Sequence, residues 1–165
     1  MKRHPALIPF SHDHHDGLVI AQRLLQGGSK APRSNWPSDS QAQRDRVVEF
    51  ESSYLRHHLG AEEALLFPLA RRFLGPEGAR LVDELVREHE ALRNGVRQFK
   101  DSRPPDLVSQ MKDWAQLLHD HIRKEERFLF QAMQQQVPEA QLAALPASLE
   151  DYYRQHGRPE GSCLL

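Results

Sequence analysis

Histidine and glutamate recur at a fixed spacing in two separate parts of the sequence. The pattern H-x-x-x-E-E-x-x-L-F begins once at His58 and once at His121, so that Glu62 and Glu125 follow these histidines by four residues. Residues four apart lie on the same face of an α-helix, about one turn from each other. An imidazole and a carboxylate placed in this way can bind one metal ion, or the carboxylate can bridge two. The repeat therefore predicts a metal site to which both segments contribute.

A shorter pattern precedes each of these motifs. It reads H-x-x-L with an acidic residue directly after the histidine, and it begins at His15 and again at His89. The order of the four patterns indicates a duplicated pair of helices that would place four histidines and two glutamates around one centre. His14 competes with His15, because the apolar stripe of that segment extends back to His14, whereas the match to His89 favours His15. We keep both as candidates and prefer His15.

The types of donor indicate which metal would bind. Imidazoles with oxygen-rich bridges suit iron or manganese, whereas zinc sites more often use thiolates or are dominated by histidine. A single His–Glu pair is explained equally well as an exposed pair on a helix surface. Two matched pairs whose glutamates fall on apolar stripes are different, because a buried carboxylate is costly unless it is paired or bound to a metal. Those stripes carry Leu65, Leu69, Trp114, Leu118 and Phe128.

The second glutamate of each motif has a different predicted role. Glu63 and Glu126 fall about 100° further round the helix than the glutamates that precede them. This places them at the surface or beside a ligand histidine. We expect them to orient a ligand histidine rather than to bind the metal.

The elements that must position these residues are helices, because apolar residues recur at helical spacing along most of the chain. The first is expected from about Ser11, with Ser11 or Asp13 as its cap, to Gln26, and a loop rich in Pro, Gly and Ser should occupy residues 27–41. A second helix is expected from Asp39 or Ser40 to about Phe73, and a third from Pro76, after a turn, through Phe99. A fourth should lie between the breaker at residues 103–106 and the stop at Val137, and a shorter one over residues 139–154. Pro68 should kink or break the second helix near its end. Residues 157–165, which include the only cysteine, Cys163, are expected to form a frayed tail.

Four long helices followed by a shorter one predict an all-α fold, a four-helix bundle with a short extra C-terminal helix. We expect residues 1–137 to form the bundle and residues 138–165 to form the C-terminal helix and tail. The core of such a bundle is a natural place for metal ligands on facing helices.

Composition excludes several classes of function. The net charge of −1 over 165 residues predicts no nucleic-acid partner, and the longest apolar run, seven residues that include Pro68, is far shorter than the roughly 20 needed to span a membrane. A single cysteine cannot form an internal disulfide, and residues 1–10 lack the pattern of a signal peptide, so we expect a cytoplasmic protein. Outside the metal-ligand cluster there is no nucleophile or acid–base constellation that would indicate a hydrolase.

The two H-x-x-x-E-E-x-x-L-F motifs, the D-H-H-x-G-L segment at Asp13 and the E-H-x-x-L segment at Glu88 resemble the hemerythrin-like, HHE cation-binding proteins over roughly residues 10–133. The resemblance implies an up-down-up-down bundle that holds two non-haem iron ions, with manganese or zinc as substitutes. It also implies bridging roles for Glu62 and Glu125. The terminal ligands that it implies are the histidine of the first helix (His15 or His14), His58, His89 and His121.

The resemblance implies binding or sensing of O2 or a related small oxidant, or the handling of iron. The alternative is a diiron redox enzyme that reduces O2 or peroxide, and a third reading is a regulatory module whose partner docks on the C-terminal helix. Arg93 stands four residues after His89, where hemerythrins have a further histidine. We therefore expect one ion to have fewer protein ligands than the other, with water or the oxidant completing its coordination. The sequence allows a homodimer but does not determine the oligomeric state.

Overall fold

All regular structure is helical in the described part of the chain, which comprises residues 2–26 and 36–160 of a computed structural model. A 3-10 turn at Pro5–Leu7 leads into the first half of the molecule, whose helices are α1 (Ile8–Leu25), α2 (Ser40–Phe50), α3 (Arg56–Ala61) and α4 (Phe67–Phe73). Two π turns join the last three of these helices without interruption. Glu51–Leu55 connects α2 to α3, and Glu62–Leu66 connects α3 to α4.

The second half of the molecule contains α5 (Gly75–Phe99), α6 (Asp106–Lys124), α7 (Phe130–Gln136) and α8 (Glu139–His156). A third π turn, Glu125–Leu129, joins α6 to α7. The predicted all-α fold class is thus confirmed for the described residues, and the predicted C-terminal helix is present as α8. The middle of the predicted loop, residues 27–35, and Cys163 lie outside the described residues.

Two helix boundaries follow from local chemistry. Helix α2 begins at Ser40 as expected, because the Asp39 side chain accepts a hydrogen bond from the backbone nitrogen of Ala42 at 2.8 Å. Helix α1 begins earlier than expected, at Ile8, and neither predicted cap is used. The preceding Leu7 is fully buried in the core, and Pro9 falls in the first turn, where a proline needs no backbone N–H.

A break at Pro68, one of the two expected outcomes, does not occur in the second helical segment; the other outcome, a kink, stays a prediction. Pro68 falls in the first turn of α4, directly after a π turn, and the chain remains helical on both sides of it. Proline has no N–H to donate, and the π turn before it shifts the local hydrogen-bond pattern, so the chain remains helical at this position.

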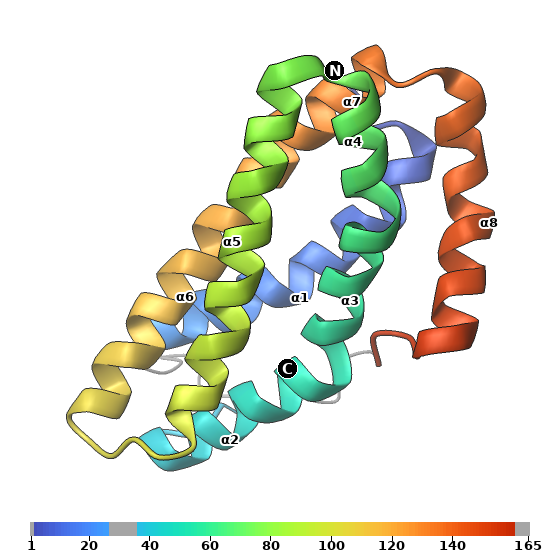
Figure 1. Ribbon diagram of the computed structural model, residues 1–165. Coiled ribbons are helices and arrows are strands. Elements are labelled where there is room, and N and C mark those ends of the chain that lie inside the picture. The colour runs from blue at the N-terminus through green and yellow to red at the C-terminus, as the bar shows by residue number, and fades with distance from the viewer. Residues whose placement is uncertain (1, 27–35, 161–165) are drawn as a thin grey trace.

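The helices pack around a common interior, as Figure 1 shows. Helix α5 packs against both α4 and α6, and α1 packs along α6. Helix α8 lies on the outside, against α3 and against the turn that precedes α1. Among the described residues, no helix combines the length and the apolar character that crossing a membrane requires.

The apolar core is divided into two clusters, and a polar layer lies between them. The first cluster contains the beginning of α1, the end of the second helical segment, α7 and the inner face of α8; its members include Leu7, Phe10, Leu66, Leu85, Phe130 and Leu149. The second contains the end of α1, the beginning of the second helical segment, the end of α5 and the inner face of α6; its members include Ile20, Phe50, Leu59, Leu92, Trp114 and Leu118. Four of the ten histidines and two glutamates are also buried, and in each long helical segment they lie near the place where the buried residues change from one cluster to the other.

The π turns change which residues face the core. After each motif glutamate the backbone N–H bonds five residues back, from Phe67 to Glu62 and from Phe130 to Glu125. The additional residue in the turn rotates the following side chains by one position. Leu129 is therefore fully buried, and Phe128, which a regular helical period places on the core stripe, is 61% exposed.

Candidate metal centre

Six buried polar side chains converge in the layer between the two apolar clusters. Each is at most 3% exposed, although all are groups that normally face water. They come from every long helical segment of the bundle: His14 from α1, His58 from α3, Glu62 from the π turn after α3, His89 from α5, His121 from α6, and Glu125 from the π turn after α6.

These side chains form two groups that share both carboxylates. His14 and His58 belong to one group and His89 and His121 to the other, and Glu62 and Glu125 belong to both. Within each group the donor atoms all lie within 4.8 Å of one another. Two cations could therefore each be held by two imidazoles and two carboxylates.

Glu62 is oriented so that its two oxygens face histidines of different donor groups. Its Oε1 lies 3.4 Å from Nε2 of His14 and 3.2 Å from Nε2 of His58. Its other oxygen, Oε2, lies 3.5 Å from Nε2 of His89 in the second group. One carboxylate thus presents a separate oxygen to each pair of histidines.

Glu125 and the second pair of histidines complete the layer. Oε2 of Glu125 lies 3.1 Å from Nε2 of His14 and 3.4 Å from Nε2 of His121. Nε2 of His89 lies 3.1 Å from Nε2 of His121, so these two imidazoles point the same atom at a common space.

The inward-facing atoms lack hydrogen-bond partners. Both carboxylate oxygens of Glu62 and Glu125, together with Nε2 of His14, are buried and make no hydrogen bond. Leaving five such atoms unsatisfied in the interior is expensive, because burial removes the water that would otherwise bind them. Imidazole nitrogens and carboxylate oxygens are metal ligands, so this donor set fits divalent cations.

The opposite nitrogen of each imidazole, Nδ1, contacts a carboxylate outside the layer. Nδ1 of His14 contacts Oε1 of Glu126 at 2.7 Å, and Nδ1 of His89 contacts Oε1 of Glu63 at 2.7 Å. The predicted role of Glu63 and Glu126 as groups that orient a histidine is supported by these contacts. A carboxylate at Nδ1 keeps the proton there and leaves Nε2 free to bind a cation.

The other two histidines use acidic residues that the sequence analysis did not identify. Nδ1 of His58 contacts Oδ2 of Asp13 at 3.3 Å, and Nδ1 of His121 contacts Oε2 of Glu88 at 2.8 Å. Asp13 directly precedes His14 and Glu88 directly precedes His89. An acidic residue immediately before the histidine in both halves was therefore the signal that could have revealed them.

The same correspondence corrects the preference for His15 over His14. Asp13-His14 in α1 occupies the place that Glu88-His89 occupies in α5, whereas the sequence match had aligned His15 with His89. His14 is 2% exposed and belongs to the first group of donors. His15 is exposed, because one residue further along a helix turns the side chain by about 100°, here towards solvent.

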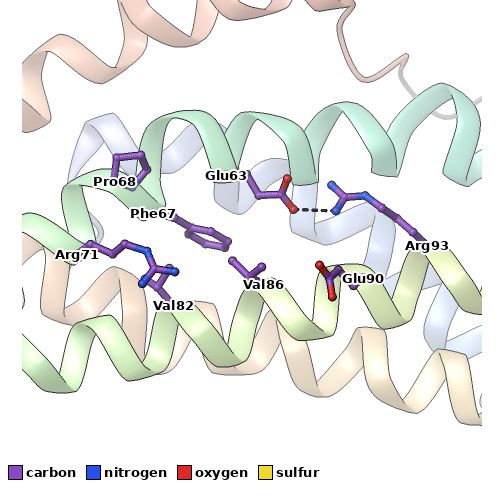
Figure 2. Close-up of a pocket in the computed structure, with 8 residues that line it drawn as sticks. All are labelled: Glu63, Phe67, Pro68, Arg71, Val82, Val86, Glu90 and Arg93. Atoms are coloured by element: carbon purple, nitrogen blue, oxygen red, sulfur yellow. Dashed lines mark hydrogen bonds and ion pairs between the residues drawn. The ribbon is translucent and has the colours of Figure 1, made fainter.

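Arg93 pairs with Glu63, the second glutamate of the first motif. Its Nη1 donates a hydrogen bond to Oε1 of Glu63 at 2.8 Å (Figure 2). The same oxygen also contacts Nδ1 of His89. The sequence predicts fewer protein ligands for one ion than for the other. The two groups instead contain the same number of side chains, because each has two histidines and both glutamates. Arg93 lies outside the layer, on a groove of about 420 Å³ between the α4 and α5 segments.

In the ion-free protein, His58 and Glu62 shift each other's pKa in opposite directions. Burial alone would lower the pKa of His58, but the Glu62 charge and the hydrogen bond with Asp13 outweigh it and raise the pKa to about 9. Burial would raise the pKa of Glu62, but the charge of His58 and the close contacts with the surrounding histidines hold it well below its ordinary value. Glu62 therefore remains anionic and attracts either protons or metal cations.

Comparison with known proteins agrees with this geometry. The family model described as hemerythrin HHE cation binding domain matches residues 7–133. A DNA nickase of Nostoc sp. (strain PCC 7120 / SAG 25.82 / UTEX 2576) is 35% identical over 81 residues, which make up 48% of this chain and 22% of that protein. No solved structure matches the chain. The matched region includes all six buried donors, and the chain belongs to the hemerythrin HHE cation binding domain family.

Proposed function

We propose that this protein holds two non-haem iron ions and binds or senses O2 or a related small oxidant. The observation that carries the proposal is the set of five buried, unsatisfied donor atoms in two groups that share Glu62 and Glu125. The ligands would be His14, His58, His89 and His121 at the ends, with the two glutamates between the ions. Manganese or zinc would be substitutes, because they accept the same nitrogen and oxygen donors.

The protein's own contribution is to fix the donors and to exclude water. The carboxylates at Nδ1 hold each imidazole in one tautomer and direct Nε2 towards the ion. The two apolar clusters cover the polar layer from both ends, so solvent has little access to it. Iron held by these histidines and carboxylates would supply electrons to a bound small oxidant.

The proposal also covers the helix topology, the location of the protein and its partners. We propose an up-down-up-down topology, since α1 and α5 run from the first apolar cluster to the second, and the other two long segments run in reverse. The division at residue 137, the cytoplasmic location and a homodimer stay predictions. No nucleic-acid partner is proposed, because the net charge is −1 and the chain covers only 22% of the nickase that it resembles.

The absorption spectrum of iron-loaded protein, reduced without air and then exposed to it, tests the function. Reversible binding of O2 should produce a visible band that disappears when O2 is removed and returns when it is restored. Rapid oxidation that cannot be reversed in this way, with turnover when peroxide is added, would favour the alternative, a diiron redox enzyme. An unchanged spectrum in a protein shown to contain two iron ions would contradict both.

A further inference from the structure

Helix α8 lies beyond the region that matches the family, yet one of its side chains reaches the candidate metal centre. The Tyr153 hydroxyl donates a hydrogen bond to Oδ2 of Asp13 at 3.0 Å. The same oxygen faces Nδ1 of His58 at 3.3 Å. A continuous chain of hydrogen bonds therefore runs from the C-terminal helix to a proposed ligand of the first ion.

Tyr153 is held firmly in this place. It is 8% exposed and belongs to the first apolar cluster, together with Leu145 and Leu149 of the same helix. Helix α8 also approaches the second helical segment closely: a Cβ atom at Gly60 would clash with the Tyr152 hydroxyl. Beyond α8, the backbone nitrogen of Glu160 donates to the carbonyl oxygen of Ser53 at 3.1 Å.

Four carboxylates contact the Nδ1 atoms of the four buried histidines, and Asp13 differs from the other three in its further partners. Each of those pairs with a cationic side chain: Glu126 with Arg3, Glu63 with Arg93, and Glu88 with Lys124. Asp13 instead receives hydrogen bonds from two phenols, since the Tyr54 hydroxyl also donates to its Oδ1 at 3.3 Å. A phenol is a neutral donor, so it orients the carboxylate without cancelling its charge. Burial and the charge of Asp13 raise the pKa of Tyr153, which keeps this hydroxyl protonated.

We propose that Tyr153 is a positioning residue for His58, and that docking of α8 and cation binding at the first group therefore favour each other. The hydroxyl of Tyr153 fixes Asp13, Asp13 fixes the His58 ring, and the ring presents Nε2 to the cation. Because coupling of two equilibria is reciprocal, a bound cation stabilises the docked α8 by the same factor by which α8 strengthens cation binding. The inference rests on the proposed function only in requiring that cations bind there.

The test compares two phenol-to-phenyl changes on the same helix. Tyr153→Phe removes only the hydroxyl that binds Asp13, and Tyr152→Phe is the matched control, because the Tyr152 ring stacks on His156. Titration with Zn²⁺ avoids redox chemistry. We expect Tyr153→Phe to raise the dissociation constant of one of the two ions about tenfold and to leave the other unchanged, as for other residues that orient a ligand. Tyr152→Phe should bind both ions as the parent protein does.

Two further measurements separate positioning from packing. In an Asp13→Asn background, Tyr153→Phe should weaken Zn²⁺ binding no further, because the chain of contacts is already interrupted. Hydrogen exchange of the α8 amides should slow when Zn²⁺ binds to the parent protein, and this slowing should be lost in Tyr153→Phe. A variant with a lower melting temperature but unaltered dissociation constants would overturn the inference, because α8 would then act by packing alone. Equal weakening by Tyr152→Phe would overturn it as well.

The outcomes also distinguish this inference from the proposed function. A parent protein that binds two Zn²⁺ ions with the expected Tyr153 dependence, but whose iron form does not react with O2, would contradict only the proposed function. A parent protein that binds no divalent cation would contradict both.

Discussion

Arg93 shares one oxygen of Glu63 with His89. The guanidinium donates to Oε1 of Glu63 at 2.8 Å, and Nδ1 of His89 contacts the same atom at 2.7 Å. Together with the charge of His89, Arg93 offsets the effect of partial burial and lowers the pKa of Glu63. A cation on the protein surface is thus linked, through one carboxylate, to a proposed ligand of the second ion.

Arg93→Gln should lower the reduction potential of the iron-loaded protein. Removing a positive charge near the centre favours the oxidised, more positive state, and Glu63 would then act on His89 with its full negative charge. The pair is partly exposed, so the effect should be on the order of 1 kcal/mol or less, roughly 40 mV for one electron. Spectroelectrochemical titration measures it. Arg71→Gln is the control, because Arg71 lines the same groove but pairs with Asp83; an equal shift there would show a general charge effect.

His14→Ala should reduce metal content, and His15→Ala should not. His14 is buried among the donors and His15 is exposed, although the two are adjacent in sequence. Metal analysis of the purified variants decides between them. Loss of metal in His15→Ala alone would contradict the assignment of His14.

Glu62→Ala and Glu125→Ala should each bind fewer than two ions. Both carboxylates belong to both groups of donors, so neither ion would keep its full set of ligands. Glu90→Ala is a suitable control, because Glu90 is an exposed glutamate one residue after His89. Two ions per chain retained in both variants would rule out a bridging role.

Metal loading should raise the melting temperature, and by more as the pH rises from about 6 to about 9. In the ion-free protein the pKa of His58 is raised to about 9 from its ordinary value near 6.5. Its protonated form therefore stabilises the folded ion-free protein at low pH, and this contribution is lost as the pH rises through 9. Metal ions need the neutral imidazole, so their contribution grows over the same range. Melting curves of loaded and chelated protein should converge at low pH; identical curves at neutral pH would argue against a buried site.

Leu129→Ala should destabilise the protein far more than Phe128→Ala. Leu129 is fully buried, and its truncation should cost about 2–5 kcal/mol. Phe128 is 61% exposed, so its change should cost roughly 0.5 kcal/mol or less. Urea unfolding of the two variants measures the difference. A larger loss for Phe128→Ala would mean that the helix keeps a regular period through the motif and has no π turn.

The sequence by itself determined the helical fold, the positions of most helix ends and five of the six buried donors. It could do so because these features depend on local spacing: residues i and i+4 share a helix face, and the repeated motif places His58, Glu62, His121 and Glu125 by that rule alone. The equivalent motif in the third long helix marks His89 in the same way.

The tertiary structure decided what helical spacing leaves open. A regular period of 3.6 residues does not reveal a π turn, so it assigns Phe128 rather than Leu129 to the core, although the Leu-Phe pair that ends both motifs marks the buried positions. The choice between His14 and His15 depends on which of two adjacent residues faces α3 and α6. The link from Tyr153 to Asp13 joins residues 140 positions apart, and packing of α8 alone brings them into contact.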